Sequence, residues 1–321
     1  MHYRKLGNTG LRISELSLGS WVTFANQTDV ARTVDLMAAA YAAGVNFFDN
    51  AETYAAGESE RVMGKALKQL GWRRGSYLVS TKLYWGIHDT PLERNTLSRK
   101  YLLEGIAGSL QRLDLEYVDI VYCHRDDADT SIEEIVRAMH SIIERGQALY
   151  WGTSEWEASR IIEALAFAEA NSLHKPVVEQ PVYNLFEQHR FGGDYDAVYP
   201  QRGYGTTTWS PLASGVLTGK YRDGIPADSR ASVKGYEWLA EQLVDADRNR
   251  KVQALKPLAD DMGASLAQFA IAWCLQNAHV SSVLTGASRV EQVHENLKAL
   301  EYRDRFTPEL MAAIDEIITS G

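Results

Sequence analysis

The sequence has little of several features that would each indicate a particular class of protein. It contains only two cysteines, Cys123 and Cys274, and both lie within apolar runs, so a disulfide framework is excluded and we expect two buried, reduced thiols. No apolar run approaches the roughly 18 residues that a membrane helix requires. The first residues, MHYRKLGNTG, are not followed by the apolar stretch or the cleavage site of an export signal. We therefore expect a soluble, cytoplasmic protein.

Positive charge is scarce as well. The chain carries 33 Lys and Arg against 42 Asp and Glu, a formal net charge of −9, which argues against binding to nucleic acid or to anionic lipid. The histidines and cysteines show no metal-ligand spacing, so we predict no metal. A Rossmann dinucleotide site is not indicated, because the first predicted strand runs into LSLGSW, with one glycine, rather than into GxGxxG.

What the chain does have is a regular alternation of short apolar runs with amphipathic stretches. The apolar runs predict strands near residues 15–20, 45–49, 77–82, 118–124, 148–153, 177–182, 205–210 and 280–286. The amphipathic stretches predict helices near residues 28–43, 58–70, 99–113, 131–145, 157–170, 193–201, 249–262 and 289–299, several of them beginning with a capping residue such as Thr28, Ser131 or Ser288. Continuous apolar strands such as VDIVYC suit a parallel sheet buried on both faces. The repeat therefore favours a (β/α)8 TIM barrel over an open doubly wound sheet.

Other segments do not fit the simple repeat. Residues 2–13 predict a β-hairpin that caps the bottom of the barrel. Residues 211–248 are too long for a plain connection, which indicates a functional role. Residues 264–278 and 307–319 predict extra helices. Since no linker or low-complexity run divides the chain, we expect a single domain over residues 1–321.

Three of the predicted strands end in side chains that can transfer or bind protons. The segment VNFFDNAETY, residues 45–54, delivers Asp49 and Tyr54 to one strand end, and two later strands run into Lys82 and His124. In a barrel the carboxyl ends of the strands meet at one mouth, so we expect these side chains to lie together. Taken singly, each has a structural interpretation: a turn cap, a solvated strand end or a core histidine.

The combination of the four residues favours a site that protonates an oxyanion. A phenol titrates near 10, so Tyr54 needs a neighbouring cation such as Lys82 to act as an acid at neutral pH. Asp49 can hold Lys82 charged and in place. His124 can donate a hydrogen bond to a substrate oxygen on which charge develops.

Aromatic residues near the predicted mouth indicate a substrate pocket. Trp21, Tyr84, Trp85 and Trp156 all lie close to predicted strand ends. Packing in the core is an equally good explanation for some of them.

Longer motifs carry a resemblance to a known family. They are WVTFANQ (21–27), FFDNAETYAAG (47–57), LSRKYLLEG (97–105), LEYVDIVYCHR (115–125), YWGTSEW (150–156), TTWSPLASGVLTGKY (207–221), SLAQFAIAWC (265–274) and the stretch from Gly286 to Asn296. From end to end the chain resembles the aldo-keto reductases, and most closely the branch that contains the β subunits of voltage-gated potassium channels and their plant and bacterial relatives. The resemblance implies that Tyr54 is the acid and base, that Lys82 and Asp49 tune it, and that His124 orients the carbonyl. Mammalian channel subunits have asparagine at that last position, whereas typical reductases have histidine, as here.

The resemblance also implies a nicotinamide cofactor, NADPH or NADP+, laid across the barrel mouth without a Rossmann fold. Ser154 and Gln180 would hold its carboxamide, and Ser20, Trp21 and Asp49 would lie beside the reactive ring. The other implied contacts are Trp209, Ser210, Pro211, Leu212 and Lys220 in a loop over the pyrophosphate, and Arg230, Gly286, Ser288, Gln292, Glu295 and Asn296 at the adenosine end. The N-terminal amides of the last helix suit a phosphate, and Lys220, Arg230 and Arg289 favour NADPH over NADH.

We therefore expect an oxidoreductase that reduces aldehydes or ketones to alcohols by direct hydride transfer from NADPH, with Tyr54 as general acid. The alternative is an NADPH-binding, redox-sensing regulatory β subunit of a potassium channel. As partners we expect a small carbonyl substrate, no nucleic acid and no direct membrane insertion. A homo-oligomer and, under the alternative, a channel partner are both compatible with the sequence. One departure from the channel subunits is Glu155, where they have a basic residue.

Overall fold

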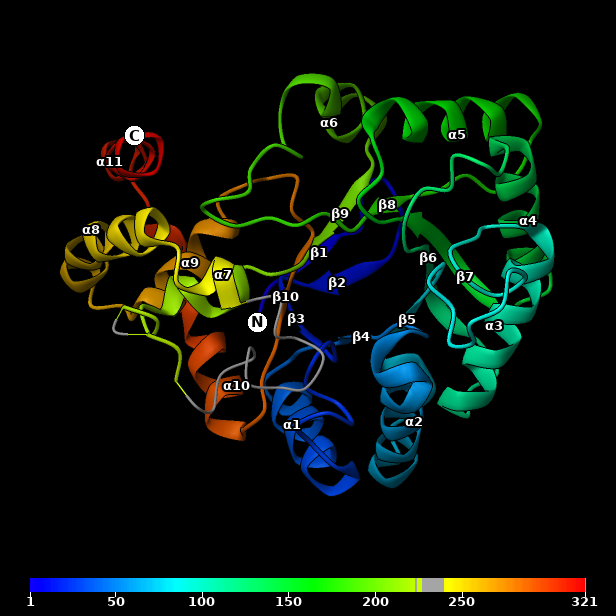
Figure 1. The fold of residues 1–321 in the computed structure, drawn as a ribbon, viewed down its shortest axis with the longest axis horizontal. Helices are drawn as coiled ribbons and strands as arrows, with labels where there is room; N and C mark the ends of the chain where they lie inside the picture. The colour runs from blue at the N-terminus through cyan, green and yellow to red at the C-terminus, as the bar shows by residue number, and fades with distance from the viewer. Residues whose placement is uncertain (223, 227–239, 321) are drawn as a thin grey trace.

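The computed structural model describes residues 1–222, 224–226 and 240–320. In this part of the chain, a closed barrel of parallel strands has the order β10-β3-β4-β5-β6-β7-β8-β9 (Figure 1). Its strands are β3 (Leu16–Gly19), β4 (Phe47–Asp49), β5 (Leu78–Leu83), β6 (Val118–Cys123), β7 (Ala148–Thr153), β8 (Val178–Glu179), β9 (Gly205–Thr208) and β10 (Ser282–Thr285). The predicted (β/α)8 barrel is confirmed, although most strands are shorter than the apolar runs that predict them.

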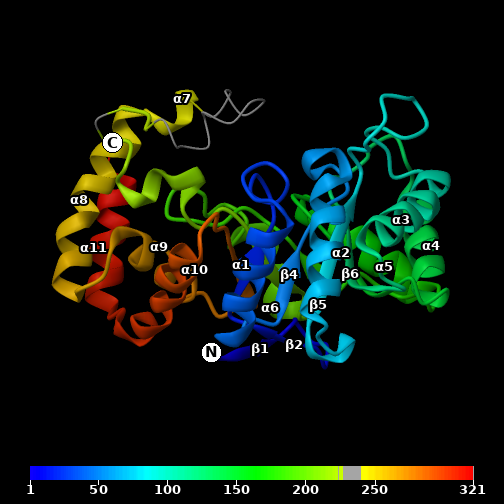
Figure 2. The ribbon, with the colours of Figure 1, turned by 90° about the horizontal axis from the view of Figure 1, so that it is seen from below.

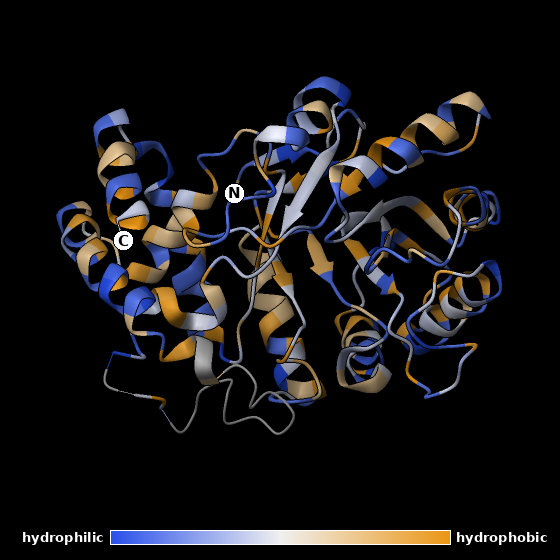
Figure 3. Cartoon of the chain, turned by 45° about the horizontal axis from the view of Figure 1, so that its top comes forward, coloured by the Kyte–Doolittle hydropathy of each residue, from blue (hydrophilic) through white to orange (hydrophobic). Residues whose placement is uncertain are grey.

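Helices surround the barrel and alternate with its strands. They are α1 (Val30–Ala42), α2 (Glu58–Leu70), α3 (Arg99–Leu113), α4 (Ile132–Glu144), α5 (Ala158–Ala170) and, after β10, α10 (Val290–Leu297). Helix α4 shows why such segments fold: Ile135, Met139 and Ile142 share one face and are fully buried. Its opposite face is polar, and the same mixture of hydrophilic and hydrophobic residues marks the other outer helices (Figure 3).

The capping residues are only partly as predicted. The Ser131 hydroxyl accepts the N–H of Glu134 and caps α4, which confirms that prediction. For α1 the cap is Asp29 rather than Thr28, because Asp29 Oδ1 accepts the N–H of Arg32. For α10 the capping position is held by Arg289 rather than Ser288, without a side-chain cap.

An N-terminal hairpin closes the end of the barrel opposite α7 (Ala240–Leu243) (Figure 2). Strands β1 (Tyr3–Lys5) and β2 (Arg12–Ser14) pair antiparallel. The fully buried Leu6 and Ile13 pack in one cluster with residues of the barrel strands. Gly7 has φ +53, and a Cβ there would lie 2.3 Å from the carbonyl oxygen of Gly203, so this close approach requires glycine. The predicted hairpin is therefore confirmed.

The predicted helix over residues 193–201 is broken. The structure has a 3-10 turn, η3 (Gly193–Ala197), followed by the four-residue α6 (Tyr199–Arg202). Gly192 and Gly193 both have positive φ, and a proline lies at the start of α6. Proline is tolerated at the first turn of a helix but not in its interior, so the segment cannot continue as one regular helix.

Two C-terminal helices exchange the roles that the sequence suggests. Residues 249–262 are predicted as a barrel helix and residues 264–278 as an addition. In the structure α9 (Leu266–Cys274) is buried along nearly its whole length and packs beside α10. Helix α8 (Ala246–Met262) lies outside it, next to α11 (Pro308–Thr319), as Figures 1 and 2 both show. The nearly all-apolar sequence of α9 explains its inner position.

Both cysteines are free and buried, as predicted. Burial raises the pKa of the Cys123 and Cys274 thiols above the ordinary range. Among the described residues, no helix is both long enough and apolar enough to cross a membrane. Residues 211–248 contain the 3-10 segment η4 (Ala213–Thr218) and α7, and part of this stretch lies outside the described residues.

Candidate active site

The side chains predicted at three strand ends lie together. Asp49 ends β4, and its Oδ2 lies 2.5 Å from Nζ of Lys82 in β5. Lys82 is fully buried and donates a second hydrogen bond, of 2.8 Å, to the carbonyl oxygen of Asn50. His124 directly follows β6, and its N–H donates to the carbonyl of Leu83 at 2.9 Å. The strand register of a parallel barrel is thus what gathers these residues.

Tyr54 reaches the same place through a strained turn. Lys82 Nζ donates to Tyr54 Oη at 3.2 Å and lies 4.9 Å from the centre of the ring. Tyr54 begins η1 (Tyr54–Gly57), in which Ala55 and Ala56 have φ of 49° and 52°. A left-handed conformation costs a non-glycine residue about 1–2 kcal/mol. Strain of this kind is found where a structure must hold one side chain in a set position, here the phenol at the lysine.

Glu52 ties the Tyr54 turn to the next loop. Its Oε1 accepts the N–H groups of Tyr84 at 2.9 Å and Gly86 at 3.2 Å. Its side chain is buried, and burial raises the pKa of the carboxyl group. Glu52 belongs to the motif that predicts Asp49 and Tyr54, but no local pattern in the sequence indicates its role.

The Asp49–Lys82 pair is held from several sides. The second carboxylate oxygen of Asp49, Oδ1, accepts hydrogen bonds from Ser80 Oγ at 2.7 Å and Gln180 Nε2 at 3.1 Å. Burial lowers the pKa of Lys82, and the charge of Asp49 opposes this shift. A lysine with a lowered pKa gives up its proton more readily, so it is suited to share a proton with the phenol at its side.

The environment of His124 favours the neutral form of its imidazole. Burial, followed by the charges of Lys82 and Arg125, holds the pKa of its imidazole well below the usual range. Its ring centre lies 5.9 Å from that of Tyr54. Its Nδ1 is buried and has no hydrogen-bond partner among the described residues. A neutral imidazole can donate one hydrogen bond from the other nitrogen, so His124 is suited to orient a carbonyl oxygen.

A cavity of about 640 Å³ opens above these residues, within the usual range for small-molecule sites. Asp49, Tyr54 and His124 lie at its wall. Most of the predicted cofactor residues also line it, namely Trp21, Ser154, Gln180, Trp209, Ser210, Pro211, Leu212, Lys220, Gly286, Ser288, Gln292, Glu295 and Asn296. The structure therefore brings into one cavity segments that lie more than two hundred residues apart in the sequence.

Some predicted residues do not line this cavity. Ser20 is fully buried, and its Oγ has no hydrogen-bond partner among the described residues. Lys82 lies behind Asp49 and Tyr54 and acts on the cavity only through them. Arg230 lies outside the described residues. Of the aromatic candidates, Trp21 and Trp85 line the cavity, whereas Tyr84 and the fully buried Trp156 do not.

Glu155 shapes one wall of the cavity. Its Oε1 accepts hydrogen bonds from Trp209 Nε1 at 2.8 Å and from the N–H of Val182, and its Oε2 lies 3.4 Å from Arg190 Nε. Trp209 in turn meets Trp21 edge to face, with ring centres 5.8 Å apart. Glu155 is thus the anchor of an aromatic pair that faces the cavity.

The other end of the cavity is polar. Gln292 Oε1 accepts hydrogen bonds from the N–H of Ser288 at 2.8 Å and from its hydroxyl at 3.2 Å. Asn296 Nδ2 donates to the carbonyl of Gly286 at 3.2 Å. Glu295 Oε2 accepts from Gln268 Nε2 at 2.9 Å. These contacts organise the segment before α10 and its first turns into a compact polar wall.

Sequence reasoning missed part of the lining. The missed residues are Gly19, Thr23, Gln27, Thr53, Arg125, Ser214, Gly215, Thr218, Ala267, Ile271, Leu284, Thr285 and Ala287. Several of them directly neighbour predicted site residues in the sequence. This adjacency is the signal that could identify them as lining residues. Arg125 is the clearest case, because it follows His124 at the end of β6.

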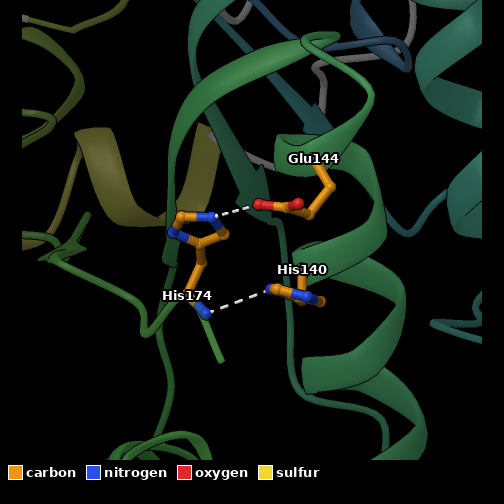
Figure 4. A group of neighbouring side chains, drawn as sticks. All are labelled: His140, Glu144 and His174. Carbon is orange, nitrogen blue, oxygen red and sulfur yellow. Dashed lines mark hydrogen bonds and ion pairs between the residues drawn. The ribbon is translucent and has the colours of Figure 1, made fainter. Parts of the chain in front are cut away.

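A second group of polar side chains lies outside this cavity. His140 and Glu144 on α4 meet His174, which follows α5, with candidate ligand atoms within 4.8 Å of one another (Figure 4). His174 Nε2 and Glu144 Oε1 are 2.8 Å apart, and the N–H of His174 donates to His140 Nδ1 at 3.2 Å. The bond to His174 lowers the pKa of Glu144. These hydrogen bonds account for the grouping without an ion, and the prediction that no metal takes part stays a prediction.

The parallel barrel gathers a phenol, a buried ion pair and an imidazole at the carboxyl ends of its strands, an arrangement suited to acid–base chemistry. Residues 15–319 match the family model described as the aldo/keto reductase family, and the chain belongs to this family, whose members generally use nicotinamide cofactors. Together with its family, this arrangement makes the chain a barrel oxidoreductase. Two relatives carry the name "Probable voltage-gated potassium channel subunit beta". The one from Oryza sativa subsp. japonica is 53% identical over 321 residues and the one from Arabidopsis thaliana 50%, each covering 100% of this chain and 97% of the relative.

Proposed function

We propose that the chain is an NADPH-dependent carbonyl reductase that converts aldehydes or ketones to alcohols. The observation that carries this proposal is the position of Lys82 Nζ, 2.5 Å from the Asp49 carboxylate and 3.2 Å from the Tyr54 hydroxyl. Lys82 is buried directly behind these two residues, which line the cavity. Such an arrangement serves to move one proton at one phenol. Membership of the aldo/keto reductase family supports the same chemistry.

The residues of the cavity fit a dinucleotide. Ser154 and Gln180 lie near the catalytic end and would hold the carboxamide. At the other end, Ser288, Gln292 and Asn296 offer the polar groups that an adenosine portion requires. Gly215 also lines the cavity, and its φ of +102° is a conformation that favours glycine.

Ser154 and Gln180 would hold the nicotinamide, which when bound would supply the hydride that the carbonyl carbon accepts. His124 orients the carbonyl by donating a hydrogen bond to its oxygen. As negative charge develops on that oxygen, Tyr54 transfers its hydroxyl proton to it. Lys82 stabilises the phenolate that is left, and Asp49 holds Lys82 in position. The proton on Tyr54 is then restored from solvent.

A preference for NADPH over NADH rests on positive charge near the cavity. Lys220 lines the cavity, and Arg289 stands at the start of α10. Charged side chains of this kind recognise a phosphate group such as the one that distinguishes NADPH. Arg230, which the resemblance adds to this set, is included in the proposal on that ground alone.

The experiment is to follow NADPH oxidation with a panel of aldehydes and ketones, using wild type, Tyr54→Phe and Tyr84→Phe. Cofactor binding is measured separately by fluorescence titration. We expect Tyr54→Phe to lower kcat by about 10²–10⁴, because the proton donor is lost, while NADPH affinity changes little. Tyr84→Phe is the matched control, because Tyr84 does not line the cavity. Turnover by Tyr54→Phe at the wild-type rate would refute the assignment.

A second candidate is favoured by the names of the two relatives, which describe channel β subunits. Under it the chain binds NADPH as the redox-sensing β subunit of a potassium channel. Tight NADPH binding with negligible oxidation on every carbonyl, together with co-purification of a channel domain, would support this candidate. Reduction of aldehydes without binding to any channel domain would exclude it.

A further inference from the structure

Arg125 presents positive charge to the cavity next to the proposed catalytic residues. It directly follows His124, and it lines the same cavity as Tyr54 and Trp85. Its guanidinium carbon lies 5.7 Å from the centre of the Trp85 ring, which is 6.4 Å from the His124 ring. The guanidinium group therefore lies beside the region where a carbonyl substrate would bind.

Within the described residues, Arg125 has no carboxylate at ion-pair distance. Its hydrogen bonds there use Nη1 alone, donated to the carbonyl of His124 and, at 3.4 Å, to Ser154 Oγ. Nε and Nη2 are left to bind another group. One edge of a guanidinium can bind both oxygens of a carboxylate or phosphate at once.

The carboxylates that could neutralise Arg125 are engaged elsewhere. Asp126 pairs with Arg160 at 3.0 Å. Asp127 accepts hydrogen bonds from the N–H of Leu97 at 2.8 Å and from Thr130 Oγ1 at 2.6 Å.

Other acidic side chains at the cavity wall or behind it are also committed. Glu295, which lines the cavity, pairs with Lys298 at 2.7 Å. Asp49 pairs with Lys82. Glu155 binds Trp209 and lies 3.4 Å from Arg190 Nε. A partly buried cation without a counter-ion is costly, so a ligand that supplies the negative charge gains from filling this position.

We propose that Arg125 binds the anionic group of the substrate, so that the preferred substrates are short aldehydes or ketones that carry a carboxylate or a phosphate. The proposal rests on the proposed function, and it names the substrate class for that site. The chain between carbonyl and anion must be short, because Arg125 adjoins His124 in sequence and shares its wall of the cavity. The stack on Trp85 holds the guanidinium in place for this contact.

Two other roles would also explain a partly buried arginine here. Arg125 could support the loop after β6 through the carbonyl of His124, or it could touch the cofactor through Ser154. The first role would make its loss equally harmful for every substrate. The second would show as weaker cofactor binding. Both differ from a substrate-specific effect.

The experiment compares matched substrates that differ in charge. For the carboxylate we would use succinic semialdehyde against butanal, and for the phosphate glycolaldehyde phosphate against glycolaldehyde. The proteins are wild type, Arg125→Met, Arg125→Lys and the control Arg137→Met, whose arginine is half-exposed on α4 and paired with Glu133. For each we would measure kcat and KM, the NADPH affinity, and the quenching of tryptophan fluorescence by succinate and by glycerol phosphate.

We expect wild type to prefer at least one anionic substrate over its neutral partner by about tenfold or more in kcat/KM, mainly through KM. Arg125→Met should reduce that ratio to near one, Arg125→Lys should retain part of it, and Arg137→Met should leave it unchanged. Which of the two pairs responds identifies the anion as carboxylate or phosphate.

Several results would overturn the proposal. They are a wild type without preference for either anion, an Arg125→Met variant that loses anionic and neutral substrates equally, and a variant whose main defect is NADPH affinity. If wild type reduces none of the carbonyls, the proposed reductase function has failed. In that case the fluorescence titration with succinate and glycerol phosphate tests the anion site at Arg125 independently of turnover. Anion quenching that is lost in Arg125→Met would support the anion site, and quenching that is absent in wild type would overturn it.

Discussion

The two halves of the cavity are built differently. The half formed by β4, β5 and β6 carries Asp49, Lys82 and His124 at or next to strand ends, where buried hydrogen bonds and an ion pair hold them. The half formed by the loop after β9 and the start of α10 offers polar groups from loops and a short helix, such as Ser288 and Gln292. The first half takes its geometry from the barrel strands, and the second half takes its geometry from contacts within loops and at a helix end.

This difference suits the strand half to proton transfer and the loop half to binding of the cofactor. Proton transfer requires atoms held within a few tenths of an ångström, which rigid strand ends provide. Binding a long cofactor requires many moderate contacts, which loops provide and can release. Four predictions test this division.

The largest expected effect is in the half of the cavity formed by β4, β5 and β6. Lys82→Met leaves Asp49 buried without its partner, so we expect a loss of about 3–5 kcal/mol in the free energy of unfolding and a fall in kcat of about 10²–10⁴. The double variant Asp49→Asn with Lys82→Met removes the unpaired charge and should recover most of the stability but none of the activity. Urea unfolding measures the free energy of unfolding, and NADPH oxidation measures kcat. If the double variant is no more stable than Lys82→Met, the charge pair is not what holds this half together.

A second effect in the buried part of the barrel depends on pH. Burial raises the pKa of Glu179 from 4.5 to about 8, so the folded protein keeps a proton that the unfolded chain releases. Stability should therefore fall as pH rises through the window from 4.5 to about 8 and level off above it.

Glu179→Gln should remove this slope, because glutamine cannot ionise. The stability of the variant relative to wild type should rise by on the order of a few kcal/mol across that pH window. Urea unfolding at acidic and at alkaline pH measures the change. An unaltered pH dependence in Glu179→Gln would mean that the folded protein does not hold this proton.

A smaller effect is expected in the half of the cavity formed by the loop after β9 and the start of α10. Lys220→Ala combined with Arg230→Ala should weaken NADPH binding by about tenfold or more and NADH binding far less, because only NADPH carries the additional phosphate. Lys100→Ala, on the exposed face of α3, is the matched control. Fluorescence titration with each cofactor gives the ratio of NADPH affinity to NADH affinity for each protein. Equal losses for NADPH and NADH would remove these two residues from phosphate recognition.

The smallest effect should come from the histidine cluster on α4. EDTA, or the substitution His174→Ala, should leave kcat/KM for an aldehyde within about twofold of wild type, because a change confined to the surface away from the cavity is usually close to neutral. A loss of turnover that Zn²⁺ restores would show that the prediction of no metal is wrong.

The same division explains what the sequence could predict. Asp49, Lys82 and His124 follow from the rule that strand ends meet at one mouth, so their position needs only the strands and the barrel. The long-range partners are different, since no local pattern shows that Glu52 accepts the N–H of Tyr84 or that Glu155 holds Trp209. The placement of α9 inside α8 is different again. The nearly all-apolar sequence of α9 favours burial, but which of the two helices takes the place in the barrel depends on packing between helices.

The central claim is that a substrate bound in the cavity receives a hydride directly from NADPH at its carbonyl carbon, while Tyr54 protonates the carbonyl oxygen. The most direct measurement uses NADPH deuterated at both positions of its reactive carbon, with mass spectrometry of the alcohol made by wild type and by Tyr54→Phe. We predict one deuterium on the former carbonyl carbon of the wild-type product, and almost no product from the variant. An alcohol without deuterium, or equal yields from both proteins, would contradict the account.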